Sequence, residues 1–460
     1  MQGQAQREHW GSHLGFILAA AGSAIGLGTL WKFPYVTGEN GGGVFVFIYI
    51  LCTFLIGMPI FIAELMLGRK AQRGAVGTFA TLTHNSTVWK GAGWLGVISS
   101  FLIMSYYSVL AGWGLNYVFM SLNQFYVGRS AQEISQIFDV LSSSGDITLF
   151  WHFLFTALTI AVVYPGVRQG IEFWSKFMTS SLFVLLVGLC AYTITLDGFP
   201  AAIKFLFSPD FSNFKPSSAL EALGLSFFTL SLGQGIMITY GSYMHRSEDI
   251  PRTSFIIGSM IILVSVLAGL MIFPVIFTFG FTPAEGRGLV FKILPLLFGK
   301  LPGALLISTL FFTLFVFTAL TSSIALVEVV VANFVDLTGW SRHRAVLITG
   351  LACFIFGIPS ALSGSNTLFA NWPVIYGKTF LATVDDLVSV WLLPVAGLMV
   401  AIYTGWFLDQ GISVEEFEAG TRWKHLWKPW RFFIRWVAPL GIIFIMLQKS
   451  GLIDVDKIRF

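Results

Sequence analysis

The chain has few charged residues. Only 11% of its 460 residues are charged, and the mean hydropathy is +0.79. Soluble domains carry about 25% charged residues, so this composition excludes an ordinary soluble protein. It predicts an all-α protein that crosses a lipid bilayer many times. The net charge of +4 is small and spread along the chain, so we expect no nucleic-acid partner.

Cysteine and metal-ligand patterns are also lacking. The three cysteines, Cys52, Cys190 and Cys353, each lie in an apolar run, and their spacing fits neither a disulfide framework nor a metal site. The seven histidines form no metal-ligand spacing, and no nucleophile–base pair stands out. We therefore expect buried thiols and a protein that is not an enzyme.

No segment between the apolar runs is long enough for an ordinary extramembrane domain, so we expect one membrane domain over residues 1–460. Windows of spanning length predict eleven transmembrane helices. These windows lie near 14–37, 44–67, 94–122, 148–164, 172–194, 218–241, 255–280, 303–332, 346–360, 386–407 and 433–448. The ninth window is short, and the tenth could begin earlier.

The distribution of Lys and Arg predicts the orientation. With the N-terminus inside, the cytoplasmic loops receive more of these residues than the outer loops, with dense stretches at 69–73 and 422–431. This bias favours a cytoplasmic N-terminus in a multi-pass protein of the cell (inner or plasma) membrane. We expect the bilayer to be its main surroundings, and the protein to be a monomer or a weak dimer.

Glycine-rich interruptions occur within two of the predicted spans. The first is Gly22–Gly28 and the second is Ser231–Gly235. Non-helical backbone at membrane depth is tolerated only where protein encloses it or where it lines a cavity. Two such breaks in comparable positions of two halves predict the central site of a secondary transporter.

The order of the spans predicts two halves of five helices each. Repeat one covers about 10–195, repeat two about 216–407, and an extra helix about 428–448. The discontinuous helices are the first and sixth, so each opens one half. Five spans reverse the orientation of the second half, which gives an inverted repeat.

Three motifs make a family resemblance specific. WGSHLGFILAAAGSAIGLGTLWKFPYVTGENGGGVF (Trp10–Phe45) resembles the first-helix signature of the neurotransmitter:sodium symporter family. FFTLSLGQG (Phe227–Gly235) and TALTSSIAL (Thr318–Leu326) resemble its sixth- and eighth-helix signatures. The motifs occur in the family's order over nearly the whole chain. The resemblance implies the family's fold of ten core helices, and it favours the bacterial branch that transports amino acids.

A sodium site is predicted where the first and eighth helices meet. Thr321 and Ser322 place adjacent hydroxyls in an apolar helix, and the unwound stretch Gly22–Ile25 supplies carbonyls. Such neutral oxygens suit a small hard cation, although hydroxyls can also bond back to carbonyls one turn earlier. The resemblance implies that the ligands are the carbonyls of Gly22, Ile25 and Thr318 and the hydroxyls of Thr321 and Ser322.

The family's other ion sites are altered in this sequence. Thr29 and Ile261 stand where the family's first sodium site has side-chain ligands. At the chloride site of animal members, Tyr49 and Ser265 are retained, but Leu225 and Ile261 replace polar ligands. We therefore expect one sodium ion per cycle and no chloride.

The substrate is expected to bind between the two breaks. Free N–H groups at the broken helix ends suit a carboxylate, and the resemblance implies that Tyr107 binds it together with Leu27 and Gly28. Monoamine-transporting members have Asp at the position of Gly26, so glycine there favours an amino acid. The predicted substrate residues are Ala24, Gly26, Leu27, Gly28, Ile103, Tyr107, Phe228, Thr229, Ser231, Gln234 and Leu326.

Charged residues match the family's two gates. Lys32 and Asp385 match the outer ionic gate, in which the family usually has Arg. Lysine lacks the bidentate fork of arginine, so we expect looser closure. The inner gate is matched by Arg7 and Asp336, with Trp10 and Tyr243 beside them. Outside this motif, the inner pair would be read as ordinary surface charge.

Glu64 lies deep in the second span, where a carboxylate is a functional candidate by default. The resemblance implies that it binds free N–H groups at the sixth-helix break. Together, the sequence predicts a sodium-coupled symporter of a small neutral amino acid that works by alternating access. One alternative is a proton-coupled amino-acid or amine transporter in which Glu64 titrates. Another is a substrate-sensing or channel-like membrane protein.

Overall fold

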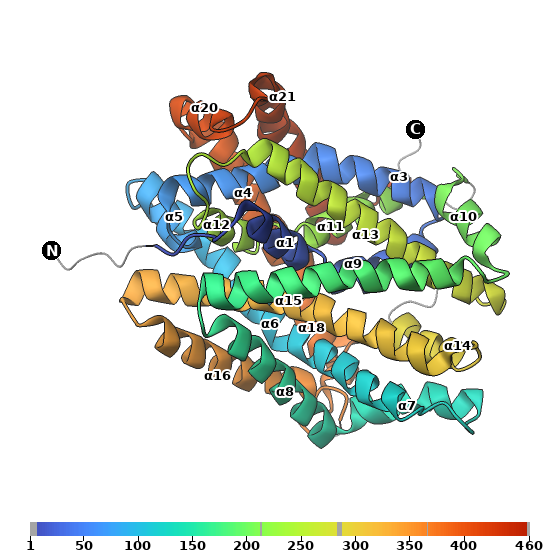
Figure 1. Ribbon diagram of the computed structural model, residues 1–460. Helices are drawn as coiled ribbons and strands as arrows, with labels where there is room; N and C mark the ends of the chain where they lie inside the picture. Colours follow the sequence, from blue (N-terminus) through green and yellow to red (C-terminus); the bar gives the residue numbers. More distant parts are fainter. Residues whose placement is uncertain (1–6, 212–213, 283–287, 366, 458–460) are drawn as a thin grey trace.

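A computed structural model of the chain describes residues 7–211, 214–282, 288–365 and 367–457, and over these residues it is helical without strands (Figure 1). Seven π-helical stretches, labelled η, continue or join the α-helices. The helices are α1 (His13–Ala24), η1 (Gly28–Lys32), α2 (Phe33–Glu39), α3 (Gly43–Cys52), η2 (Thr53–Gly57), α4 (Met58–Ala71), α5 (Ala75–Leu82), α6 (Thr87–Leu122), α7 (Ala131–Ser143), α8 (Gly145–Val163), η3 (Val167–Glu172), α9 (Phe173–Thr193), α10 (Phe199–Phe207), α11 (Pro216–Thr229), α12 (Ile236–Gly241), α13 (Ile250–Thr278), η5 (Leu289–Ile293), α14 (Leu294–Phe298), α15 (Ala304–Thr338), α16 (Arg342–Ala361), α17 (Trp372–Tyr376), α18 (Phe380–Asp386), η6 (Leu387–Leu392), α19 (Leu393–Ile402), η7 (Tyr403–Phe407), α20 (Gln410–Glu418), α21 (Trp427–Phe432), η9 (Phe433–Val437) and α22 (Ala438–Lys449), with short 3₁₀ turns at Lys424–Leu426 and Val455–Lys457.

Within the described residues, nine continuous helices are long and apolar enough to cross a membrane. A tenth span is the pair His13–Ala24 and Gly28–Glu39, which is bent by 50°. The sixth predicted span is the pair α11 and α12, each of which is too short to cross alone. The polytopic helical fold is thus confirmed, whereas the count of eleven and the inverted repeat stay predictions. The ninth span, predicted to be short, is a full-length helix, Arg342–Ala361.

Prolines explain why several spans contain π-helical turns. In five places the π-helical stretch is followed one residue later by a proline, namely Pro34, Pro59, Pro295, Pro394 and Pro439. Proline has no N–H group, and its ring clashes with the carbonyl four residues earlier. The preceding turn therefore widens, and the helix continues without a sharp break.

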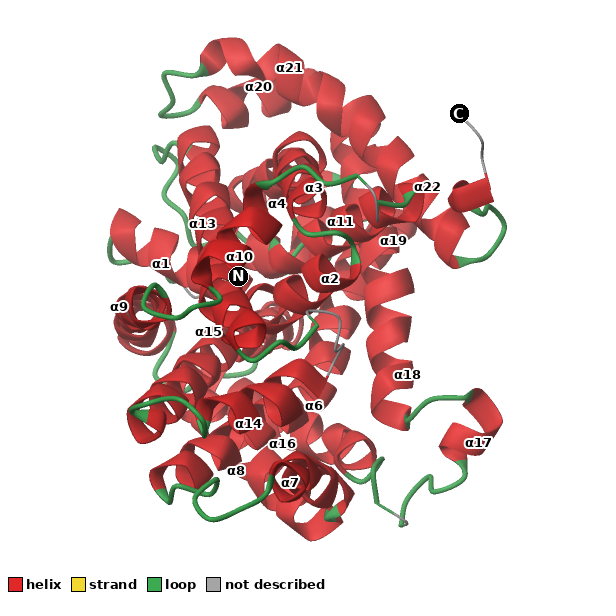
Figure 2. Cartoon of the chain, turned by 90° about the vertical axis from the view of Figure 1, so that its right-hand side faces the viewer, coloured by secondary structure: helices red, strands yellow, loops and turns green. Residues whose placement is uncertain are grey.

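The broken helices lie at the centre of the molecule. In Figure 1 the long helices α9, α13 and α15 run nearly side by side around α1, α11 and α12. Contacts agree with this view, since α1 packs against α9, α13 and α15, while α12 packs against α4 and α15. Figure 2 shows α2 and α11 at the centre of the perpendicular view. The two breaks are therefore enclosed by protein rather than exposed to lipid.

The first break is seen in the hydrogen bonds of Gly26. In a continuous helix its N–H group would donate to the carbonyl of Gly22, but it donates to the carbonyl of Ala24 at 2.9 Å. The helical ladder resumes where the N–H of Thr29 donates to the carbonyl of Gly26 at 3.0 Å. The carbonyls at the end of α1 are thereby left for other partners.

The second break is set by alternate left-handed residues. Ser231, Gly233 and Gly235 have φ angles of +54°, +71° and +71°. Glycine adopts this conformation without cost, whereas serine is strained there. A side chain at Gly233 would also place its Cβ 2.4 Å from the carbonyl oxygen of Leu393. This stretch therefore cannot continue α11 into α12 as one helix.

Candidate functional site

The two breaks enclose a small cavity. Its volume is about 20 Å³, and it is lined by Ser23, Ala24, Gly26, Leu27, Gly28, Ile103, Tyr107, Phe228, Ser231, Gln234, Ile236, Ser322 and Leu326. Every predicted substrate residue except Thr229 is among them. A water molecule needs about 10–15 Å³ by this measure, so the site is closed around very little free space.

Thr229 is the exception because its hydroxyl is held elsewhere. It lies 2.9 Å from the hydroxyl of Tyr49, which in turn lies 3.3 Å from that of Ser265. Ser265 donates to the carbonyl of Ile261 at 2.9 Å. Tyr49 and Ser265, at positions that match the family's chloride site, are thus linked by hydrogen bonds through Tyr49 to Thr229. The prediction that Thr229 lines the substrate site does not match this geometry.

Gly26 lets three elements approach each other. A Cβ at this position would lie 2.5 Å from Oγ of Ser322 and 3.3 Å from the hydroxyl oxygen of Tyr107. The N–H of Leu27 donates to the same Tyr107 hydroxyl at 3.3 Å. An N–H group and two hydroxyls thus converge beside a residue that has no side chain of its own.

Three of the predicted sodium ligands, Thr318, Thr321 and Ser322, lie beside the first break. Ser322 donates to the carbonyl of Ser23 at 2.8 Å and to that of Thr318 at 3.3 Å. Thr321 donates to the carbonyl of Thr318 at 3.0 Å, and its Cβ would lie 3.3 Å from a Cβ at Gly22. Thr321 bonds back within its own helix, but Ser322 also crosses to the first break. This neutral, oxygen-only set fits a sodium ion, which would replace these hydrogen bonds.

Ser23 was missed by the sequence reasoning. Its carbonyl accepts from Ser322, and Oγ of Ser231 approaches the same oxygen at 3.5 Å. Its own hydroxyl is buried without a hydrogen-bond partner and belongs to a cavity-lining residue. Ser23 lies inside the Gly22–Gly28 interruption, and this placement could have identified it as a site residue.

Glu64 reaches the second break from α4. Its Oε1 accepts the N–H of Gly233 at 2.8 Å, and its side chain is fully buried. Oε2 has no hydrogen-bond partner. The carboxyl group therefore holds one N–H group that the break leaves without a helical partner.

The predicted inner-gate residues contact one another and the second broken helix. Arg7 and Asp336 form an ion pair at 2.7 Å, and Asp336 also accepts the N–H of Gly74 at 2.6 Å. The guanidinium group of Arg7 lies 4.7 Å from the ring centroid of Tyr243. The indole of Trp10 donates to the carbonyl of Tyr240 at 3.0 Å. These contacts tie the chain before α1 to α12 and α15.

A second ion pair beside this gate was also missed. Glu328, fully buried in α15, lies 2.6 Å from Arg342 and accepts the hydroxyl of Tyr243 at 2.5 Å. Tyr243 therefore connects the Arg7 and Glu328 pairs. The rule applied to Glu64, that a carboxylate within an apolar span marks a functional site, would have found Glu328.

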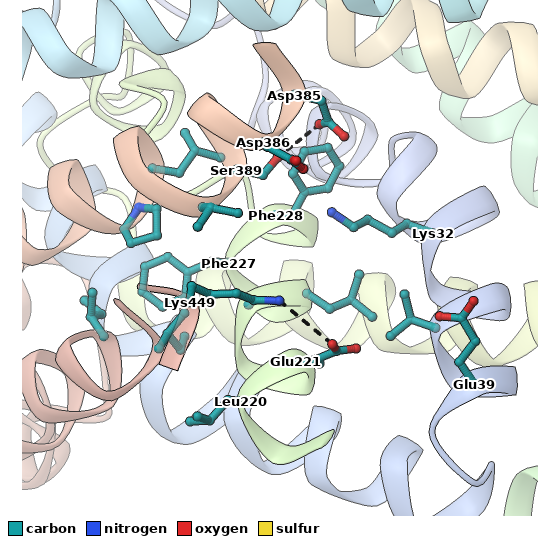
Figure 3. Close-up of a pocket in the computed structure, with 18 of the residues that line it drawn as sticks. Lys32, Glu39, Leu220, Glu221, Phe227, Phe228, Asp385, Asp386, Ser389 and Lys449 are labelled. Carbon is teal, nitrogen blue, oxygen red and sulfur yellow. Dashed lines mark hydrogen bonds and ion pairs between the residues drawn. The ribbon is translucent and has the colours of Figure 1, made fainter. Parts of the chain in front are cut away.

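The predicted outer-gate residues line a larger cavity of about 260 Å³ (Figure 3). Asp385 accepts from the hydroxyls of Tyr106 at 3.0 Å and Ser389 at 3.1 Å. The ammonium group of Lys32 lies 4.8 Å from the ring centroid of Phe228. Tyr107 and Phe228 line both the central cavity and a cavity of about 30 Å³ next to Lys32. These two rings therefore separate the central site from the outer vestibule.

Broken helices around a buried cavity are typical of a secondary transporter. The chain belongs to the Sodium:neurotransmitter symporter family, whose pattern it matches over residues 7–126 and 123–454. It is thus a membrane transporter of a sodium-dependent class and not an enzyme.

Individual proteins similar to this chain are also sodium-dependent transporters. The chain is 38% identical over 446 residues to the uncharacterized sodium-dependent transporter YhdH of Bacillus subtilis, covering 97% of this chain and 98% of the relative. It is 32% identical to an uncharacterized sodium-dependent transporter of Haemophilus influenzae, covering 96% and 98%. The crystal structure of MhsT in complex with L-phenylalanine superposes with a TM-score of 0.88 at 39% identity, covering 96% of this chain and 99% of MhsT.

Proposed function

We propose that this protein is a sodium-coupled symporter of a small neutral amino acid, with one sodium ion per cycle and no chloride. The observation that carries the proposal is the surroundings of Gly26, where the N–H of Leu27 and the hydroxyls of Tyr107 and Ser322 meet beside the cavity. We further propose that the protein lies in the cell membrane with a cytoplasmic N-terminus, as a monomer or weak dimer.

Each part of a zwitterion has a counterpart in the cavity. The substrate carboxylate accepts from the N–H of Leu27 and the hydroxyl of Tyr107, which raises the strength of both hydrogen bonds. The ammonium group is held by carbonyls at the end of α1. The side chain meets Ile103, Phe228 and Leu326, an apolar wall that favours a neutral substrate. MhsT binds L-phenylalanine, and a nutrient amino acid transporter of Drosophila melanogaster is 25% identical to this chain.

The sodium ion occupies the site of Gly22, Ile25, Thr318, Thr321 and Ser322. Ser322 connects the sodium site to the substrate site, because its Oγ reaches the Ser23 carbonyl and also faces Gly26. Sodium binding fixes the unwound end of α1 against α15 and so orders the substrate's N–H donors. Closure of the outer vestibule, followed by separation of Arg7 from Asp336, then exposes the cavity to the other side.

A screen of the twenty amino acids by thermal shift, with and without sodium, tests this function. A ligand at 100-fold its dissociation constant stabilises the folded protein by about 2.7 kcal/mol. We expect a shift with one or more neutral amino acids only when sodium is present. Shifts that are equal in sodium and potassium would contradict sodium coupling.

Proton coupling is the second candidate, favoured by the unpartnered Oε2 of buried Glu64. Glu64→Gln keeps a carbonyl oxygen for Gly233 but cannot titrate. Sodium-driven uptake that persists in this variant, with unchanged pH dependence, supports the sodium symporter. Loss of a pH-driven component would support the proton-coupled alternative.

A further inference from the structure

A group of aromatic and basic side chains lies on the surface of the last span. The guanidinium group of Arg435 lies 4.0 Å from the ring centroid of Trp406 and 5.8 Å from that of Trp436. That of Arg431 lies 5.7 Å from the ring centroid of Trp427. We call these five residues the Arg431–Arg435 patch.

The backbone holds this patch in place. Gly405 in η7 packs so closely on η9 that a Cβ there would lie 2.9 Å from Cα of Arg435. The indole of Trp406 donates to the carbonyl of Arg435 at 3.1 Å, and its ring meets that of Trp436 at 4.6 Å between centroids. The guanidinium group of Arg435 is thus fixed against a preformed aromatic surface.

The two arginines lack an anionic partner within the described residues. Neither forms an ion pair within 4.0 Å, and Nη1 of Arg431 and Nε of Arg435 are buried without a hydrogen-bond partner. They lie one helical turn apart, so their charges repel each other. Asp409 accepts the N–H of Ile412 at the start of α20 and forms no ion pair with Arg431 within 4.0 Å. Lys428 adds positive charge on the next turn.

The patch faces the surroundings of the protein at the level of the membrane interface. Trp406 lies one residue before the end of the span Phe380–Phe407, and its side chain is 44% exposed. Trp436 is 46% exposed and Phe432 57% exposed. Tryptophan at a span end marks the headgroup level. Figure 2 shows α21 and α22 at the edge of the bundle.

From this geometry we propose that the Arg431–Arg435 patch binds the phosphate of an anionic phospholipid in the leaflet nearest α20 and α21. The two guanidinium groups donate to the phosphate oxygens, which removes their mutual repulsion. Trp406 and Trp436 contact the glycerol and upper acyl chain. The excess of positive charge selects an anionic over a zwitterionic headgroup.

Native mass spectrometry of the full chain, titrated with phosphatidylglycerol or phosphatidylcholine, tests the proposal. The wild type should bind phosphatidylglycerol more tightly. Arg431→Gln with Arg435→Gln should lower that affinity about tenfold or more, because two charge-assisted hydrogen bonds are lost. Arg344→Gln is the matched control, since Arg344, at the start of α16, lies 4.6 Å from the ring centroid of half-buried Trp340. It should bind phosphatidylglycerol as the wild type does.

Arg435→Lys is a second variant that keeps the positive charge. Its melting temperature without lipid shows whether it folds as the wild type does. It should weaken phosphatidylglycerol binding several-fold, because the flat group stacked on Trp406 is lost. Unchanged phosphatidylglycerol affinity in both the double variant and Arg435→Lys would overturn the proposal. So would displacement of the lipid by inorganic phosphate at equal concentration, which would make this a free-phosphate site.

Discussion

Substituting Gly26 by alanine should weaken sodium binding, although Gly26 is not one of the proposed sodium ligands. The added Cβ would lie 2.5 Å from Oγ of Ser322, much closer than a carbon and an oxygen can approach. Because Ser322 is held by the Ser23 carbonyl at 2.8 Å, its hydroxyl must leave that position. The variant therefore loses one oxygen ligand of the proposed sodium site.

The magnitude follows from the interaction lost. A polar contact to a charged group contributes about 1.5–3 kcal/mol, which corresponds to a tenfold to hundredfold rise in the dissociation constant for sodium. The shift of melting temperature with sodium concentration measures this constant. Gly188→Ala is the control, since a Cβ at Gly188 has no neighbour within 4 Å and should leave the constant unchanged.

A double-mutant cycle separates this mechanism from general damage. In a Ser322→Ala background the clash disappears, because the nearest atom of residue 322 to the new Cβ becomes its own Cβ at 3.4 Å. Gly26→Ala should then cost little further sodium affinity. An equal loss from Gly26→Ala in both backgrounds would refute the reasoning.

Three further substitutions give distinct outcomes. Arg342→Met leaves Glu328 buried without its cation and should lower stability by about 3–5 kcal/mol, seen as a large fall in melting temperature that Glu328→Gln partly restores. Tyr107→Phe removes the hydroxyl at Leu27, so amino-acid affinity should fall about tenfold or more while the shift caused by sodium alone persists. Asp385→Ala releases Tyr106 and Ser389 at the outer vestibule, so a cysteine placed there should react faster, whereas an unchanged labelling rate would mean that Asp385 does not hold the vestibule closed.

The central site could be predicted from sequence because its signals are local. Glycine runs at Gly22–Gly28 and Ser231–Gly235 indicate broken helices, and the structure has both breaks at these positions. The positive φ angle of Ser231 could not be predicted, because a serine adopts it only when the surrounding packing overcomes the local strain.

Contacts between distant segments were harder to predict. Glu328 meets Tyr243, 85 residues away in the chain, and nothing in the apolar run around Glu328 indicates this partner. Thr229 looks like a cavity residue from its place at the end of α11, but the choice between the cavity and Tyr49 depends on side-chain direction. Helix lengths were underestimated where polar residues flank an apolar core, as at the start of α6, where Thr87 precedes the predicted window.

The claim of one sodium ion and no chloride rests on Thr29 and Ile261 at the first sodium site and on Leu225 and Ile261 at the chloride site. Uptake into proteoliposomes, measured against sodium concentration with the amino acid found in the screen, tests it most directly. A hyperbolic response with a Hill coefficient of about one, unchanged when gluconate replaces chloride, is the predicted result. A clearly sigmoidal sodium response, or uptake that requires chloride, would contradict the account.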